Sequence, residues 1–471
     1  YVSGFYVKSD ELYNKDRAYP YNSDDFRGIC SPDGSSCGGN TVVGGLNGSN
    51  VYTQGAPTAS LFMVRPYDPT NTTAQAARYS VLNAANCNGT MYTLNAAELA
   101  ANGTAPTSVC QVDYTKNYGV INPKIERFGF SSRVTAKVSD SIEGYAEFNF
   151  MQSKVSYTGL PAVFRGAAPT GIFYPQFSTA DAAATRAAGS GIIALPIYIC
   201  PRTGGVSAVM INGVATVPGC TAANGTLNPN NPFAAAGQVA RLVGRDLNHV
   251  TYNETRNRAY RGAMGFNGQI TDKIGFNLGV TAMHVDLRRT QDGYANIQHL
   301  LDVIADGSYN FRNPSASSQA TLDYLYPTNR VNASSDQFQV DGSLNGSLMQ
   351  LPGGSAQLAI GGTVRYEAVD APSGNSDILG PTQRYFTLNA FGTKGSRWIT
   401  SAYAELEAPV LEQVTLNAAG RYDHYSSGQH AFSPKFGIKF KPMRELMIRG
   451  TFSKGFRIPS FGEANALPTT G

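Results

Sequence analysis

Apolar and polar residues alternate one by one along several segments of the chain. Residues 432–440 read FSPKFGIKF, in which Phe, Pro and Ile occupy every second position and Ser, Lys and Gly the others. The same period of two recurs in residues 126–138, 274–282, 356–366 and 413–423. Successive side chains of a β-strand point to opposite faces, so this period predicts strands with one apolar and one polar face. By this criterion the chain contains about eleven strands.

The connections between these segments alternate in length. Short links lie near residues 139–143, 271–273, 350–355, 408–412 and 441–445. Between them lie long polar stretches, at about 14–124, 158–250, 288–335 and 368–396, and a shorter one near 426–431. Short turns at one end of a sheet and long loops at the other are typical of transmembrane β-barrels, whose periplasmic turns are short and whose extracellular loops are long.

This pattern predicts an all-β fold, an antiparallel transmembrane β-barrel in which residues 1–471 form one partial barrel domain. Lipid offers no hydrogen bonds, so every backbone group must pair with a neighbouring strand. The apolar face would then contact lipid and the polar face would line the lumen. The residues predicted to face lipid include Leu278, Leu416, Phe436 and Ile438. Those predicted to face the lumen include Asn277, Arg421, Lys435 and Lys439.

Two smaller features are predicted near the ends of strands. Residues 297–307 have the apolar spacing of a helix and end in Gly307, a residue type that commonly terminates helices. His299 within this segment is interpreted as an ordinary polar loop residue. Trp398 is the only tryptophan and should lie at the outer membrane interface, where aromatic rings collect. The tyrosines expected to share this belt are Tyr6, Tyr157, Tyr366 and Tyr425.

Composition agrees with a barrel and argues against several other classes. The net charge is only +4 and 15% of residues are charged, which favours neither a nucleic-acid groove nor a polybasic membrane patch. The 50 Gly, 26 Tyr and 23 Phe residues suit strands and turns. No uninterrupted apolar segment approaches the ~18–20 residues of a membrane helix. No nucleic-acid partner is expected.

The six cysteines form three pairs of sequence neighbours, each in a segment rich in Gly, Asn, Ser or Pro. These pairs are Cys30 with Cys37, Cys87 with Cys110, and Cys200 with Cys220. Pairing between sequence neighbours is the simplest of the possible connectivities. We therefore expect three disulfides that staple the long loops in an oxidising compartment. The alternative is free structural cysteines in a cytosolic protein. No metal site is expected, because no CxxC occurs and the histidines do not cluster near the cysteines.

The sequence contains no recognisable catalytic or cofactor-binding motif. GxSxG, HExxH, P-loop and dinucleotide fingerprints do not stand out, and the acidic residues in the strands form no defensible pair. We therefore expect neither an enzyme nor a cofactor. Basic residues recur on the predicted lumen face, at Arg127, Arg133, Lys137, Arg365, Arg421, Lys435, Lys439 and Arg449. They could simply form the charged, water-exposed lining of the lumen, contact an internal acidic plug, or attract an anionic solute.

Residues 432–463, FSPKFGIKFKP…ELMIRGTFSKGFRIPSFGE, resemble the barrel of TonB-dependent outer-membrane receptors. In that family a strand with SPK.G…P runs through a turn into a strand ending GFR.PS..E, and residues 401–426 look like the strand pair before it. The resemblance implies a barrel of about 22 strands, plugged by an N-terminal globular domain. It implies import of a scarce nutrient with energy from the TonB complex. It also implies the bacterial outer membrane, with the long loops extracellular and with lipid and lipopolysaccharide around the barrel.

The chain shows no plug domain and no TonB box before Tyr1, and about eleven strands cannot close such a barrel in lipid. We therefore expect residues 1–471 to be part of a longer polypeptide that contacts TonB through an N-terminal region not in this chain. The nutrient could be a siderophore, a vitamin, an oligosaccharide or a peptide. The alternatives are a passive porin-like barrel, a ligand- or adhesion-binding outer-membrane barrel without energy coupling, and a secreted β-rich adhesin or structural protein.

Overall fold

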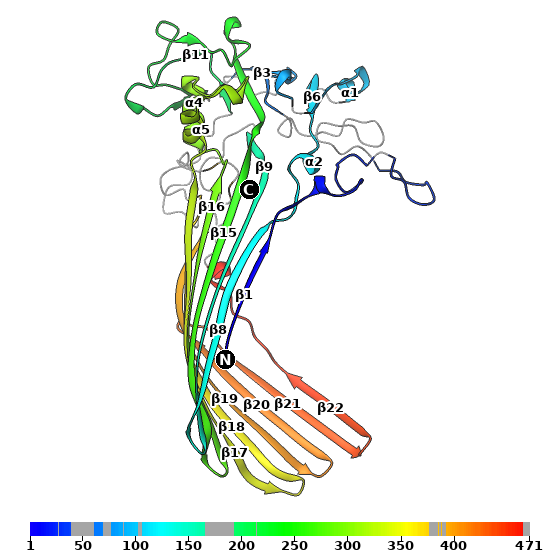
Figure 1. Cartoon of the computed structure of the whole chain (residues 1–471), viewed down its shortest axis with the longest axis vertical. Coiled ribbons are helices and arrows are strands. Elements are labelled where there is room, and N and C mark those ends of the chain that lie inside the picture. Colours follow the sequence, from blue (N-terminus) through cyan, green and yellow to red (C-terminus); the bar gives the residue numbers. More distant parts are fainter. Residues whose placement is uncertain are drawn as a thin grey trace.

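The alternating segments form one large antiparallel sheet in the computed structural model of the chain (Figure 1). The structure describes residues 1–26, 28–38, 61–68, 77–87, 89–101, 106–164, 193–212, 214–375, 385, 388 and 392–464. Within these ranges, eleven strands follow one another in the order β1-β8-β9-β15-β16-β17-β18-β19-β20-β21-β22, each antiparallel to the next. The predicted antiparallel, barrel-like sheet is thus confirmed. We refer to these eleven strands as the wall.

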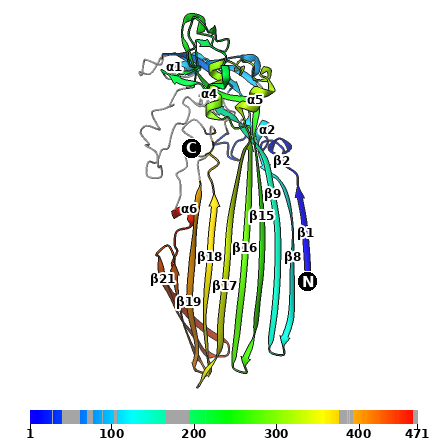
Figure 2. The ribbon, with the colours of Figure 1, turned by 90° about the vertical axis from the view of Figure 1, so that its left-hand side faces the viewer.

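The wall strands are long, and the sheet curves strongly from one edge to the other (Figures 1 and 2). Their bounds are β1 (Val2–Ser9), β8 (Lys124–Ser139), β9 (Ile142–Phe164), β15 (Val239–Thr271), β16 (Ile274–Asp292), β17 (Asn329–Leu351), β18 (Gly354–Ala371), β19 (Thr393–Leu411), β20 (Val414–Tyr425), β21 (His430–Met443) and β22 (Leu446–Ser453). The five predicted short links are all two-residue turns at the same end of the sheet (Figure 1).

The strands run further into the long connections than the sequence pattern indicated. Residues 158–164 and 239–250 were expected to be loop, but β9 ends at Phe164 and β15 begins at Val239. Residues 288–292, 329–335, 368–371 and 393–396 are likewise strand. In these extensions the hydrogen-bonded ladder continues while the alternation fades, because residues on both faces are polar or pack against loop residues. The period of two therefore marks only part of each strand.

Strand register keeps the polar residues of neighbouring strands on one common face. One continuous row of paired residues runs from Lys137 through Glu143, Asn267, Asn277, Ser343, Gly361 and Tyr403 to Arg421. We call the side of the sheet that carries this row the polar face. The opposite side, the apolar face, carries Leu278, Leu416, Phe436 and Ile438, whose side chains are exposed.

Aromatic residues gather where the apolar face ends, on the side of the long connections. They include Tyr6, Phe128, Phe150, Tyr260, Phe338, Tyr366 and Trp398. Trp398 pairs directly with Tyr366, and their ring centroids are 5.0 Å apart. Tyr157 and Tyr425 were expected to share this belt, but they pair with Asn253 and Ile399 on the polar face. That part of the prediction was wrong, because counting residues from a turn fixes a level along the strand and not a face.

The long connections fold into a separate unit at the other end of the wall from the turns (Figure 2). We call the described residues of 10–123, 193–238 and 293–328, with the end of β9 and the start of β15, the headpiece. Its main core contains Phe62, Phe164, Leu195, Leu242, Ile297, Leu300, Tyr309 and Phe311. The strands β3 (Met63–Tyr67) and β10 (Ala194–Leu195) pair with β15, which joins the headpiece to the wall.

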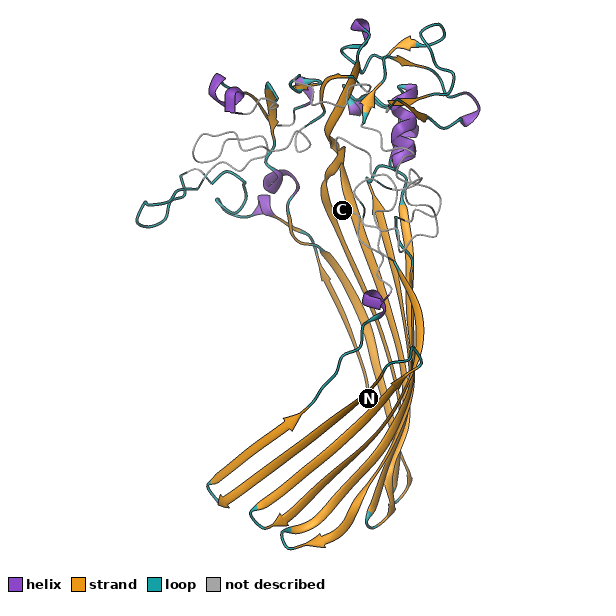
Figure 3. Ribbon diagram, turned by 180° about the vertical axis from the view of Figure 1, so that it is seen from behind, coloured by secondary structure: helices purple, strands orange, loops and turns teal. Residues whose placement is uncertain are grey.

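The remaining elements are short (Figure 3). The strands are β2 (Leu12–Tyr13), β4 (Ser80–Val81), β5 (Thr90–Thr93), β6 (Ser108–Gln111), β7 (Val120–Asn122), β11 (Tyr198–Ile199), β12 (Val209–Ile211), β13 (Val214–Thr216) and β14 (Thr226–Leu227). The α-helices are α1 (Ala96–Ala101), α2 (Tyr114–Tyr118), α4 (Ile297–Asp306), α5 (Gln319–Leu325) and α6 (Phe461–Ala464). Turns of 3-10 helix lie at Asn14–Asp16, Ala84–Asn86, Thr203–Gly205, Ala234–Ala236 and Pro314–Ala316. No helix among the described residues is long and apolar enough to cross a membrane.

The helix predicted at residues 297–307 is confirmed as α4. The Asn296 side chain accepts a hydrogen bond from the His299 backbone N–H and so caps the first turn. Gly307 follows the last turn with φ 71°, a left-handed conformation that glycine adopts without a steric penalty. The apolar stripe of the helix is buried in the headpiece core.

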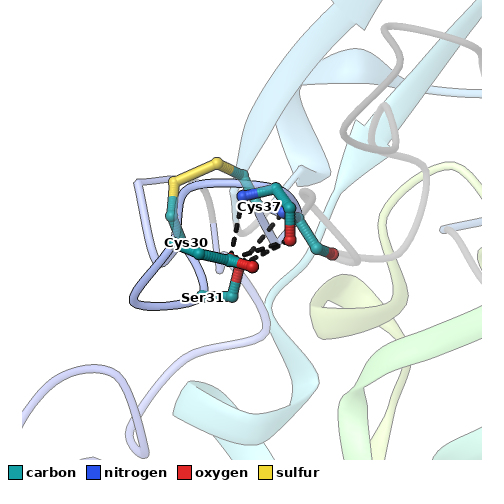
Figure 4. The surroundings of a disulfide bond; sticks show 6 residues. Cys30, Ser31 and Cys37 are labelled. Atoms are coloured by element: carbon teal, nitrogen blue, oxygen red, sulfur yellow. Dashed lines mark hydrogen bonds between the residues drawn. A yellow bond between two sulfur atoms is a disulfide. The ribbon is translucent and has the colours of Figure 1, made fainter.

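The structure contains the three expected disulfides, Cys30–Cys37, Cys87–Cys110 and Cys200–Cys220. All three lie within the long connections. In the smallest loop, the Ser31 backbone N–H donates to the Ser36 carbonyl at 2.7 Å, and the Ser36 N–H donates to Ser31 Oγ at 3.1 Å (Figure 4). These hydrogen bonds close the loop beside the disulfide, so a covalent bond and hydrogen bonds fix the same turn.

Candidate functional site

The polar face carries ion-pair networks that span neighbouring strands. Glu147 on β9 lies between two arginines, one from β8 and one from β15. Arg261 Nη1 donates to Glu147 Oε1 at 2.7 Å, and Arg133 Nη1 lies 3.5 Å from Glu147 Oε2. Asn149 Nδ2 also donates to Glu147 Oε1, at 2.8 Å. One carboxylate therefore ties three strands together.

A second network joins β18 to β19 around Glu367. Arg397 Nη2 lies 2.9 Å from Glu367 Oε2, and Arg397 Nε donates to the same oxygen at 3.0 Å. Arg365 Nε lies 2.9 Å from Glu367 Oε1, but its N–H does not point at an acceptor. The contact of Arg365 with Glu367 is therefore an attraction between charges rather than an aligned hydrogen bond.

A third network joins β19 to β20 around Asp423, which is only 2% exposed. Ser401 Oγ donates to Asp423 Oδ1 at 2.5 Å, and Arg421 Nε donates to the same oxygen at 2.9 Å. Arg421 Nη2 also donates to Ser401 Oγ at 3.0 Å. The lone pairs of this carboxylate are well satisfied, so it acts as a fixed part of the wall.

The structure places the eight predicted lumen-facing basic residues in three different surroundings. Arg133, Arg365 and Arg421 pair with carboxylates as described above, and Arg127 Nε donates to Ser153 Oγ at 3.1 Å. Lys435, Lys439 and Arg449 lie together on β21 and β22, around a shallow groove that Glu407 also lines. Lys439 and Arg449 are directly opposite each other. Lys137 lies across from Glu143 near the turns. The β21–β22 group is thus the part of the polar face best suited to attract an anion.

The segment after β22 turns back across the sheet and docks on β19 (Figure 3). Arg397 Nη1 donates to the Pro459 carbonyl at 3.1 Å, and the Arg397 guanidinium lies 4.7 Å from the Phe461 ring centroid. Thr393 Oγ1 donates to the Phe461 carbonyl at 3.1 Å. These contacts place α6 on the polar side, because Arg397 belongs to that face.

The docked turn is held by a reciprocal cap in the residues IPSFGE. The Ser460 backbone N–H donates to Glu463 Oε2 at 2.8 Å, and the Glu463 N–H donates to Ser460 Oγ at 3.3 Å. Arg457 also pairs with the Glu463 carboxylate. The family motif quoted in the sequence analysis is therefore a capping box with an added ion pair. Sequence analysis missed this role, although the S-x-x-E spacing was a signal that could have revealed it.

Sequence analysis also missed the carboxylates Glu147, Glu367 and Asp423. It found no defensible acidic pair in the strands, because each carboxylate is held by partners that include a residue of a neighbouring strand: Arg261 for Glu147, Arg397 for Glu367 and Ser401 for Asp423. Only strand register brings such partners together, and register cannot be read from one isolated segment. No cluster of His, Cys, Asp and Glu able to hold a metal ion occurs within the described ranges.

A buried polar cluster lies in the headpiece around Asp246, near the start of β15. Asp246 Oδ2 accepts hydrogen bonds from Tyr309 Oη at 2.5 Å and from Tyr326 Oη at 2.9 Å, and His249 Nδ1 lies 2.7 Å from it. Burial raises the pKa of Asp246, but the hydrogen bond and charge of His249 outweigh this, so its pKa is lowered. The hydrogen bond to Asp246 in turn raises the pKa of His249. The cluster joins β15 to the segment that carries α4 and α5.

Sequence analysis interpreted His299 as an ordinary polar loop residue, but it lies on helix α4 and packs against α5. Its Nδ1 lies 2.5 Å from the Tyr324 carbonyl oxygen, and its ring stacks on the Tyr324 ring with centroids 4.0 Å apart. Burial lowers the pKa of His299. These contacts join α4 to α5 and leave the imidazole engaged in packing.

The family model for the TonB-dependent receptor-like β-barrel matches residues 220–470, which is more than half of the chain. The matched range includes residues 432–463, on which the resemblance was based, and so confirms it. No match was found among curated proteins.

Several solved structures are similar to the chain. A mutant of the ferric enterobactin receptor PfeA from Pseudomonas aeruginosa is 11% identical, with 72% of this chain and 42% of that chain covered and a TM-score of 0.32. The ferric-catecholate import receptor Fiu from E. coli K12 is 11% identical, with 71% and 44% covered and a TM-score of 0.36. The siderophore receptor PiuA from Acinetobacter baumannii is 9% identical, with 69% and 41% covered and a TM-score of 0.32. The chain thus spans less than half the length of these three receptors.

Proposed function

The chain belongs to the family of TonB-dependent receptor β-barrels, and on this premise we propose that it is the barrel part of an outer-membrane importer. The family is one of outer-membrane transport receptors rather than enzymes. In this proposal residues 1–471 form a partial transmembrane barrel domain that takes up a scarce nutrient with energy supplied by TonB. The TonB complex would act through an N-terminal region outside these residues.

One observation carries the proposal: a continuous polar face runs across the wall, opposite an apolar face that is exposed. A sheet with this arrangement can span lipid if it is part of a closed barrel, with the apolar face outward and the polar face lining the lumen. The eight basic residues of the polar face would then face the lumen. The three carboxylate networks would make that lumen wall rigid, and the β21–β22 group would favour a ligand that carries negative charge.

The same arrangement supports an orientation for the barrel. Two-residue turns are typical of the periplasmic end of such barrels, and long connections of the extracellular end. The headpiece and its three disulfides would therefore be extracellular, surrounded at their base by outer-membrane lipid and lipopolysaccharide. The ligand would be a small nutrient such as a siderophore, a vitamin, an oligosaccharide or a peptide.

Uptake by cells that carry the whole protein tests this function. Radiolabelled ligands of the four classes should be offered to a Gram-negative strain that lacks its own receptors, with TonB present or deleted. We expect accumulation of one class only when TonB is present. Accumulation that persists without TonB would instead support the passive porin-like alternative. Surface binding without accumulation would support a ligand- or adhesion-binding barrel.

A further inference from the structure

The chain contains five histidines, and strand register brings two of them together. His424, near the end of β20, is directly opposite His430, the first residue of β21. Within the described ranges, the ion pairs and side-chain hydrogen bonds of histidine belong to His249, His284 and His299. Both His424 and His430 are exposed. In the described part of the chain, their ring nitrogens are therefore available to a ligand.

The turn between the two histidines fixes their alignment. The Gly428 N–H donates to the Tyr425 carbonyl at 2.9 Å, and the Tyr425 N–H donates to the Gln429 carbonyl at 2.9 Å. Gly428 has φ 93°, a backbone conformation that glycine adopts readily. Hydrogen-bonded and non-hydrogen-bonded pairs alternate along an antiparallel ladder, so His424 and His430 form a non-hydrogen-bonded pair. The Cα atoms of such a pair are only about 4.5 Å apart, and its side chains share one face.

The pair lies on the apolar face, just beyond the last aromatic residues of β20 and β21. Tyr422 and Phe432 are directly opposite each other, two residues along each strand from the histidines, and are 46% and 60% exposed. The intervening Asp423 belongs to the polar face. The strand positions that flank the pair on its own face are uncharged: Trp398, Thr400, Tyr422 and Phe432. No side chain at these positions would repel a cation.

Two imidazoles on neighbouring strands can chelate a metal ion that prefers nitrogen ligands. Zn–N bonds are about 2.0–2.1 Å long, so two nitrogens on one ion lie about 3 Å apart. Directly opposite Cβ atoms about 4.5–5.5 Å apart allow two rings to converge on such an ion. The His430 ring centroid lies 6.3 Å from that of Tyr422, and a rotation about χ1 would turn the ring toward His424. Ca²⁺ and Mg²⁺ prefer oxygen ligands and do not suit this pair.

We propose that His424 and His430 bind one divalent transition-metal ion, with water completing its coordination. Sequence analysis expected no metal site, because it considered histidines only in relation to the cysteines. A histidine pair is also smaller than the clusters of three or more His, Cys, Asp and Glu residues, none of which occurs within the described ranges. Imidazole suits zinc, copper and nickel, and Cu²⁺ should bind most tightly, since affinity generally rises toward copper along this series. The site does not depend on the proposed transport function, because it lies on the opposite face of the wall from the predicted lumen lining.

The fluorescence of Trp398 can report binding at this site. Thr400 is directly opposite His424, and Trp398 is the next residue on the same face of β19, a diagonal neighbour at about 7–8 Å. Cu²⁺ quenches tryptophan emission at short range, whereas Zn²⁺, with a filled d shell, does not. The whole purified protein, in detergent and without an affinity tag, should be stripped of metal and titrated with CuCl₂. The signal is the part of the emission that Trp398→Phe removes.

We expect saturable quenching by Cu²⁺ that a chelator reverses, and Zn²⁺ should compete only at higher concentration. The variants His424→Asn and His430→Asn should each weaken Cu²⁺ binding at least about tenfold, because a single imidazole loses the benefit of a second ligand at high effective concentration. His284→Asn is the matched control, since it removes another exposed histidine of the apolar face and should leave the affinity unchanged.

A heat-dependent shift in electrophoretic mobility shows whether each variant retains a folded barrel. Unchanged Cu²⁺ affinity in folded His424→Asn or His430→Asn would overturn the proposal. An equal loss in His284→Asn would place the ion elsewhere and would also overturn it. The electron paramagnetic resonance spectrum of bound Cu²⁺ gives an independent reading. Coupling to two imidazole nitrogens would support the site, and coupling to one or none would contradict it.

Discussion

The wall and the headpiece hold their structures by different means. In the wall, Phe436 and Leu278 are 55% and 46% exposed, and the strands are joined mainly by their backbone ladder and by ion pairs on one face. In the headpiece, Leu300 and Tyr309 are fully buried and the loops are closed by disulfides. The headpiece therefore covers its apolar surface with its own residues, whereas the wall depends on its surroundings to cover the apolar face.

The largest expected effect is the loss of headpiece stability, without a loss of wall stability, when Asp246 is replaced. In the variant Asp246→Ala, the hydroxyls of Tyr309 and Tyr326 and the ring of His249 lose a buried acceptor, so the headpiece should lose about 3–5 kcal/mol. Hydrogen exchange should then accelerate in α4 and α5, while the wall strands from β16 to β21 keep their protection. Asp336→Ala is the control, since this exposed carboxylate lies outside the headpiece. Equal loss of protection in the wall would show that the two regions unfold as one unit.

The wall should respond instead to a charge on its apolar face. Leu278→Arg places a guanidinium among lipid chains and should cost about 2–4 kcal/mol when the whole protein is unfolded by urea from lipid vesicles. Asn277→Arg, one residue away on the polar face, should cost much less. If the two variants are destabilised equally, the assignment of the faces is wrong, because a shift of one residue in register exchanges them.

A smaller effect should follow from the titration of His249 in the headpiece. Its pKa is raised by Asp246, so the pair stabilises the folded headpiece fully below the unfolded-state pKa near 6.5. This contribution is lost as the pH rises through the folded-state pKa. The lowered pKa of Asp246 has the opposite sign, and its contribution is lost only as the pH falls below the ordinary carboxyl range.

Headpiece stability should thus decline between mildly acidic and mildly alkaline pH, as measured by limited proteolysis of the whole protein across that range. His249→Gln should remove the decline, and His430→Gln, at the start of β21, should leave it in place. A decline of the same size in both variants would assign the pH dependence to other groups.

The smallest expected effect is spectroscopic and concerns Trp398 alone. Its side chain is 49% exposed on the apolar face beside Tyr366, so its fluorescence should be quenched by lipids brominated near the headgroup. Lipids brominated near the chain ends should quench it less. An emission spectrum that no brominated lipid changes would place Trp398 against protein instead.

The two regions also differ in how much of them the sequence could reveal. Alternation in residues 274–282 and 413–423 was enough to predict strands and their faces, because a two-sided sheet imposes a period of two. Alternation could not show that Glu147 lies beside Arg261, since that contact depends on the register between two distant segments. The predicted lumen-facing residues therefore share a face, but their partners were not foreseen.

In the headpiece only local signals were informative. The spacing of apolar residues and Gly307 predicted α4, and sequence proximity suggested the disulfide pairs. The cluster of Asp246, Tyr309 and Tyr326 joins residues more than 60 positions apart, and no periodic pattern links them. The length of β15 was also missed, because its first residues pair with β3 and β10 inside the headpiece, where the alternation no longer applies.

The unequal connections have a consequence for the order of folding. Each two-residue turn joins two strands that are adjacent in the chain. The five hairpins can therefore form with little loss of chain entropy. The pairs β1 with β8 and β9 with β15 must instead close long loops before their first contacts form. A headpiece that folds early brings those strand ends together and shortens the search. We therefore expect the core and disulfides of the headpiece to speed the pairing of β1 with β8 and of β9 with β15.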